Sequence, residues 1–325
     1  MPWRRSCPLS RKFRRLITIN LAETMSQLSL IIKNEYLTDV RSKSFWLSTI
    51  LVPLLMVGFG VFGGIMASQS ESMGSVMESL PTTPDSEQMT GMKVLGMLLG
   101  LFLTLFLMMY GAMIFNKVRA EKCNRIVEIL ATSVEGKTMM LAKIIAVGLT
   151  GLTQLFLWGL IIAVIGVGLI LVFAPEIPLD ILADSRIWTS FAWAIAFFLG
   201  GYVFFGSLYA ACGALTDKDN ENQAYMTVIT FILLGSFYIG QFAVDHGDST
   251  FAQICGYIPF TSPTIGCVNA VTGVAPVWQT LLSLVILYAS AAVALSISGK
   301  IYSCSLLLKG KNFTPKDIVT FIKSK

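Results

Sequence analysis

Hydrophobic and polar positions alternate along this chain in long blocks. Six long apolar stretches are separated by shorter polar segments, and each stretch is long enough for the helix of about 20 residues that crosses a bilayer. The stretches span residues 45–67, 94–115, 139–173, 187–215, 222–243 and 277–299. The pattern therefore predicts an all-α integral membrane protein with six transmembrane helices.

The polar segment before the first stretch has helical spacing of its own. Residues 29–46 alternate charged and apolar positions, which predicts an amphipathic helix at the membrane surface that runs straight into the first span. Lys33 and Arg41 would then face the headgroups, and Tyr36 would face the acyl chains. Lys143, near the start of the third stretch, is expected to extend its side chain to the headgroups in the same way.

The longest polar gap, residues 116–137, also predicts an amphipathic helix. Its apolar face would carry Ile126, Ile129 and Leu130. Arg125 and Glu128, three positions apart, can pair on the polar face. Seen alone, this helix could simply lie on the lipid surface.

A different pattern occupies residues 250–278, which are uncharged but interrupted by prolines such as Pro259 and Pro263. Proline excludes an uninterrupted helix, and an apolar loop in water is unfavourable, so we expect two short half-helices that enter the membrane partway. Cys255 and Cys267 lie in this segment and could form a disulfide on the outer side. The alternative is two buried thiols.

Charge sets the expected orientation. The chain has 24 Lys and Arg residues, and 22 of them lie in residues 1–44, 116–143, 216–221 and 300–325. Because basic residues near spans are retained in the cytoplasm, these segments and both termini are expected inside a multi-pass protein of the cytoplasmic (inner) membrane. Residues 1–28 are expected to be a disordered basic arm, 29–325 a single six-span domain, and 300–325 its cytoplasmic tail. Translation could also begin at Met25.

Composition agrees with a membrane protein, since 54% of the residues are hydrophobic and 13% are charged. The net charge of +5 is explained by topology and by contact with the lipid bilayer, so no nucleic-acid partner is expected. The six cysteines include no CxxC pair, and the one histidine, His246, is expected to be a solvated loop residue. No metal site and no catalytic residues are predicted.

Gly136, Lys137 and Thr138 resemble the end of a phosphate-binding loop, but the required earlier glycine is replaced by Ala131 and a membrane stretch follows. We interpret them as a connection into the third span. The sequence thus indicates no enzyme and no cofactor site on this chain.

Several segments together resemble permeases of ABC exporters of the second type, in particular the branch that includes the sodium-export permease NatB. The similar segments are residues 31–55, 121–144, 209–226, 258–284 and 299–311. This resemblance implies a six-span permease that pairs with a second permease subunit and with a separate ABC ATPase subunit, which binds the ATP. It also implies that Arg125, Ile126, Glu128, Ile129 and Leu130 form the coupling helix that contacts the ATPase.

Two departures from that branch limit what the resemblance implies about substrate. The connection between the first two spans has only about 25 residues, where relatives have a long outer domain, and Asn269 stands where relatives commonly have arginine. Export of sodium or of a small hydrophobic or toxic compound is expected, with Thr153 and Gln154 as scattered oxygen ligands for sodium. The alternatives are an ATP-independent channel or secondary carrier, and a membrane scaffold without transport activity.

Overall fold

The computed structural model describes residues 28–69, 84–123, 136–173, 185–216, 219–245 and 249–307, and the regular structure in these ranges is helical. A first helix spans residues 28–40. The others are α2 (Lys43–Gln69), α4 (Pro84–Cys123), α6 (Gly136–Phe173), α7 (Ser185–Leu215), α8 (Asp219–Asp245), α9 (Thr250–Tyr257), α10 (Ser262–Thr272) and α11 (Val277–Leu307).

Five segments within these helices are long and apolar enough to cross a membrane. They are Gly96–Glu121, Gly136–Ile165, Trp188–Leu215, Ala224–Phe242 and Val277–Ser305, in α4, α6, α7, α8 and α11. Each coincides with one of the predicted stretches. The remaining predicted span, 45–67, falls within α2, of which Lys43–Leu55 qualifies as a shorter apolar helix, so a sixth crossing stays a prediction.

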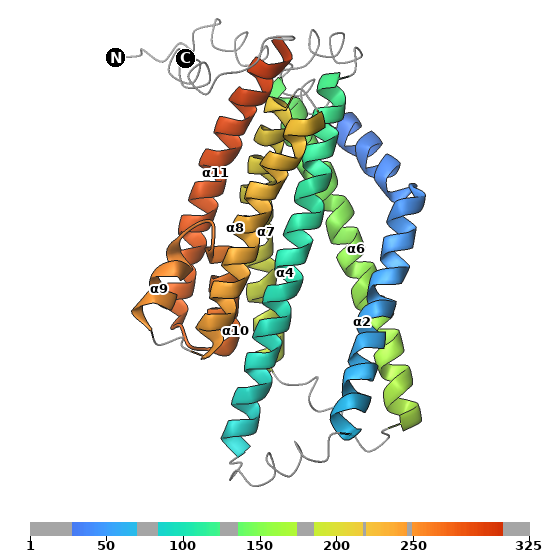
Figure 1. The fold of residues 1–325 in the computed structure, drawn as a ribbon, viewed down its shortest axis with the longest axis vertical. Coiled ribbons are helices and arrows are strands. Elements are labelled where there is room, and N and C mark those ends of the chain that lie inside the picture. Colours follow the sequence, from blue (N-terminus) through green and yellow to red (C-terminus); the bar gives the residue numbers. More distant parts are fainter. Residues whose placement is uncertain are drawn as a thin grey trace, which may run out of the picture.

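The long helices run side by side, with α2 and α6 together at one edge (Figure 1). α7 packs most extensively on α4 and α11, and the core is formed by aromatic and aliphatic side chains where these helices meet. Gly213 allows a close approach to the backbone of a neighbouring helix, because a Cβ there would lie 2.7 Å from the carbonyl oxygen of Phe115 in α4. The small residues of the fourth stretch therefore serve close helix packing, as expected.

Two helix boundaries differ from the sequence prediction. α4 continues to Cys123, past the predicted end of the apolar stretch at residue 115. The surface helix does not run straight into the first span, since the chain breaks at Arg41 and Ser42, where the Ser42 amide donates to the carbonyl of Asp39. At the α4 boundary the prediction assumed that charged residues face water, whereas Lys117 and Glu121 bind charged side chains of other helices.

The segment between α8 and α11 contains the two short helices α9 and α10 (Figure 1). Ser249 caps α9 by accepting a hydrogen bond from the amide of Ala252, and Gly273 ends α10 with φ of +73°. The hydroxyl of Thr261, between the helices, donates to the carbonyl of Cys255. How deeply this pair enters a membrane stays a prediction.

Candidate functional site

The predicted coupling residues Arg125, Ile126, Glu128, Ile129 and Leu130 lie in 124–135, outside the described residues. Both flanks of that segment are described, however. α4 ends at Cys123 directly before it, and α6 begins at Gly136 directly after it. The structure of these flanks therefore bears on what a force applied to the segment would move.

Five charged side chains meet at the flanks in what we call the ion cluster: Glu35, Asp39, Lys117, Glu121 and Lys143. The Lys117 ammonium lies 2.6 Å from a carboxylate oxygen of Glu35 and 2.7 Å from one of Asp39. The Lys143 ammonium lies 2.5 Å from Glu121 and 3.0 Å from Glu35. Glu35 thus bridges both lysines, and the cluster joins the 28–40 helix to α4 and α6.

Hydrogen bonds extend the ion cluster to a further helix. The hydroxyl of Tyr302 in α11 donates to Glu121 over 2.8 Å, and the hydroxyl of Thr150 in α6 donates to Asp39 over 3.3 Å. Glu121, in the last turns of α4, therefore contacts both α6 and α11. The end of the bundle next to residues 124–135 is held together by charge-assisted bonds, which are stronger than neutral ones.

A second set of hydrogen bonds fastens the 28–40 helix and α2 to α6. Tyr36 shares a hydrogen bond of 2.9 Å with Thr153, so it faces protein and not acyl chains, which corrects the sequence prediction. The side-chain amide of Gln154 accepts from Tyr110 and donates to Ser48 over 3.1 Å. Thr153 and Gln154, which the sequence suggested as scattered oxygen ligands for sodium, are thus hydrogen-bonded within the protein, and a role in sodium binding stays a prediction.

Burial affects the charged groups of the ion cluster. The side chain of Lys143 is 2% exposed, so the prediction that it extends to the headgroups is wrong. Burial raises the pKa of Glu35, but Lys143 and Lys117 outweigh that effect, so its pKa lies below its ordinary value. For Asp39, burial and the neighbouring charge of Glu35 outweigh Lys117 and Thr150, so its pKa is raised. The two carboxyls therefore differ in how readily they hold a charge.

The spacing of charged residues in the sequence could have indicated the ion cluster, although hydropathy could not. Glu35 and Asp39 are four residues apart, as are Lys117 and Glu121, so each pair occupies one helix face. When two helices carry opposite charges at the same spacing, the charges can pair, so the pattern indicates that the two helices face each other. Which helices face each other is decided only by the fold.

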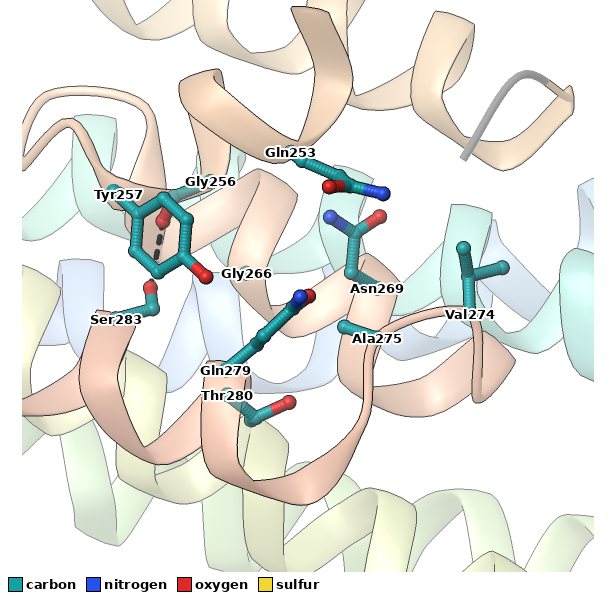
Figure 2. Close-up of a pocket in the computed structure, with 10 residues that line it drawn as sticks. All are labelled: Gln253, Gly256, Tyr257, Gly266, Asn269, Val274, Ala275, Gln279, Thr280 and Ser283. Atoms are coloured by element: carbon teal, nitrogen blue, oxygen red, sulfur yellow. Dashed lines mark hydrogen bonds between the residues drawn. The ribbon is translucent and has the colours of Figure 1, made fainter. Parts of the chain in front are cut away.

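A small pocket lies between α9, α10 and α11 on the side of the bundle away from the ion cluster. Along α4, the glycines that contact α10, Gly96 and Gly100, precede Lys117 by about 17 to 21 residues, or roughly 25 to 30 Å of helix. Figure 2 shows the side-chain amides of Gln253, Asn269 and Gln279 converging there. The pocket's free volume is about 20 Å³, enough for about one water-sized group.

The pocket is uncharged but polar. Asn269 is 6% exposed, and its side-chain oxygen has no hydrogen-bond partner within the part of the chain that the structure describes. Ser283 donates to the carbonyl of Gly256 over 2.6 Å, which closes one wall (Figure 2). Such a pocket suits a single neutral group that can donate a hydrogen bond to Asn269.

The other residues singled out from the sequence are accounted for as follows. Cys255 and Cys267 are buried free thiols, which is the alternative to the suggested disulfide. Gly136 and Lys137 lie in the first turn of α6, where Gly136 fits against Ser303 of α11, and not in a phosphate-binding loop. Across the described ranges, no group of His, Cys, Asp and Glu residues is arranged to hold a metal ion. His246 lies outside the described residues.

Comparison with known proteins identifies relatives whose sequences are similar to that of this chain. The chain is 29% identical over 239 residues to the uncharacterized protein YhaP of Bacillus subtilis (strain 168), a match that covers 72% of this chain and 56% of YhaP. It is 24% identical over 212 residues to the uncharacterized protein MJ1024 of Methanocaldococcus jannaschii, covering 65% of this chain and 49% of MJ1024. The chain spans about half the length of these curated relatives, and no solved structure matches it.

The family comparison covers most of the chain. Residues 63–300 match the family described as ABC-2 family transporter protein. The match includes α4 to α10 and most of α11, and thus the five helices that are long and apolar enough to cross a membrane. This chain therefore belongs to the ABC-2 family of transporter proteins.

Proposed function

We propose that this protein is the membrane permease subunit of an ATP-driven exporter, in which a separate ABC ATPase subunit binds and hydrolyses ATP. Members of the ABC-2 permease family are transmembrane components that normally pair with such a subunit. The observation that carries the proposal is the ion cluster, which ties both flanks of residues 124–135 to the rest of the bundle.

The ion cluster supports a mechanical role for that segment. Because the Lys143 ammonium contacts Glu121 across 2.5 Å, the end of α4 and the start of α6 cannot separate without breaking a buried ion pair. Separating this pair is costly, since the buried Lys143 would lose one of its two carboxylate partners. A push by an ATPase on residues 124–135 would therefore move α4, α6 and the 28–40 helix together, as a rigid body.

The proposed assembly contains two permease subunits and two ATPase subunits in the cytoplasmic membrane. The distribution of basic residues, with 22 of 24 in alternate gaps, supports an orientation in which residues 124–135 and both termini face the cytoplasm. The ion cluster would then lie on the cytoplasmic side and the uncharged pocket on the outer side. The same orientation would let the ATPase reach the coupling segment.

The substrate we favour is a small amphipathic or hydrophobic compound. Resemblance to the NatB branch favours sodium, which needs several oxygen ligands at one place. Thr153 and Gln154 are engaged within the protein, and the pocket at Asn269 suits a neutral hydrogen-bonding group of an amphipathic molecule. Efflux from inside-out vesicles, measured in parallel for sodium and for a hydrophobic dye, distinguishes these substrates.

The coupling role is tested by co-expression with a candidate ABC ATPase subunit from the same organism. Glu128→Arg combined with Ile129→Asp reverses one charge and polarises the apolar face, so the ATPase should no longer co-purify while the permease still inserts in the membrane. Lys33→Glu, an exposed charge reversal on the 28–40 helix, is the matched control and should leave co-purification unchanged. Normal co-purification of the double variant would refute the assignment of residues 125–130.

The rival function, an ATP-independent channel or carrier, makes a different prediction in the same vesicles. It requires substrate movement in the absence of the ATPase subunit and of ATP. An exporter moves substrate only when both are present. A scaffold without transport activity would move none in either case.

A further inference from the structure

A groove runs along an exposed face of α2. It begins directly at the chain break at residues 41–42, between the 28–40 helix and α2. Its free volume is about 470 Å³. Arg41 and Lys43 line one end, and Trp46, Leu47, Ile50 and Leu54 continue along the helix. The groove thus has a basic end and an apolar length.

The apolar length is exposed. The exposed fractions are 67% for Leu47, 58% for Ile50 and 58% for Leu54. Together with Lys43 they are spaced four, three and four residues apart, which places them on one face of the helix. α2 packs on α6, and none of the described helices covers this face.

The basic end has no counter-charge among the described residues. Arg41 and Lys43 are exposed, in contrast to Lys117 and Lys143, whose charges are balanced within the ion cluster. Asp39, the acidic residue nearest in sequence, binds Lys117 and is turned away. The break at residues 41–42 therefore presents two unpaired cations at the top of an apolar strip.

The dimensions match one leaflet of a membrane. From Lys43 to Leu54 the helix rises about 16 Å, at roughly 1.5 Å per residue. The hydrocarbon core of a bilayer is about 30 Å thick, so the strip is about as long as one leaflet is deep. Trp46 lies at the basic end, and tryptophan is enriched at the boundary between headgroups and acyl chains.

We propose that this groove is a binding site for an anionic phospholipid. The phosphate lies between Arg41 and Lys43, and an acyl chain follows Leu47, Ile50 and Leu54. A second copy of this chain fits the groove less well, because it would cover two cations without supplying an acidic partner from the same face. The site does not depend on the proposed transport function.

The test uses the full-length protein in detergent, with phosphatidylglycerol or phosphatidylcholine added, and native mass spectrometry to count retained lipids. Phosphatidylglycerol should bind about 30-fold more tightly, which corresponds to about 1 kcal/mol for each basic residue. Arg41→Gln with Lys43→Gln should abolish this preference. Lys33→Gln with Lys137→Gln, which removes two exposed charges outside the groove, should preserve it.

A second variant tests the apolar half. Ile50→Trp fills the groove and leaves both cations in place, so retention of phosphatidylglycerol should fall although the headgroup site is intact. Circular dichroism of each variant confirms that its helices are formed. The proposal is overturned if both lipids bind equally to the unmodified protein, or if the preference survives Arg41→Gln with Lys43→Gln. It is also overturned if inorganic phosphate displaces the lipid, or if the face proves to hold a second protein copy.

Discussion

Lys143 shows how much a single residue contributes to this fold. Its position in sequence, at the start of an apolar stretch, is typical of a lysine that reaches for lipid headgroups. In the structure its side chain is 2% exposed and its ammonium contacts Glu35 and Glu121. A buried ammonium is tolerated only with carboxylates beside it, so the three side chains depend on one another.

Lys143→Met tests this dependence, because methionine keeps an unbranched side chain as far as the ε carbon and removes the charged ammonium. We expect a loss of about 3 kcal/mol of unfolding free energy, at the lower end for a broken buried pair, since Glu35 and Glu121 retain 24% and 25% exposure. Chemical unfolding in detergent measures it. Lys137→Met, at an exposed position of the same helix, should change stability little. Equal stabilities of the two variants would contradict a buried, paired Lys143.

At the scale of helices, close packing depends on glycine positions, where no side chain holds two helices apart. α7 approaches α4 at Gly213, where a Cβ would lie 2.7 Å from the Phe115 carbonyl oxygen. Small residues in the fourth stretch predicted such packing before the partner helix was known. The partner could not be predicted, because hydropathy shows only that a face is apolar and not which face it meets.

Gly213→Ala should destabilise the protein by about 1–3 kcal/mol, since the new methyl group meets backbone that must move. Gly235→Ala in α8 is the control, because a Cβ there has no atom within 4 Å and alanine favours a helix. Thermal unfolding in detergent compares the two. If Gly213→Ala melts as high as Gly235→Ala, the close α4 to α7 approach is not present in the protein.

At the scale of the whole molecule, the two ends of the bundle differ in chemistry. One end holds the charged ion cluster beside residues 124–135, and the other holds the neutral pocket at Asn269. α4 connects them, since it carries Glu121 near its end and contacts α10 through Gly96 and Gly100. A displacement at the charged end would therefore reach the pocket through one continuous helix.

Glu121→Gln should uncouple the two ends without detaching the proposed ATPase subunit, because it removes the anion shared by Lys143 and Tyr302 and leaves residues 124–135 unchanged. We expect transport per ATP hydrolysed to fall about fivefold or more, as for a lost coupling free energy of about 1 kcal/mol. Tyr302→Phe, which removes one hydrogen bond only, should have a smaller effect. Unchanged transport with Glu121→Gln would exclude the ion cluster from force transmission.

The sequence alone determined the helical membrane class and the location of five apolar helices, because length and hydropathy are local properties that a bilayer selects directly. It also indicated small-residue packing around Gly213. Only the tertiary structure decided that Glu35, Asp39, Lys117, Glu121 and Lys143 meet, and that Tyr36 faces protein. The contacts of Glu35 with Lys117 and Lys143 join residues that are 82 and 108 positions apart. The energy of a buried charge depends on what lies opposite it, which no local pattern specifies.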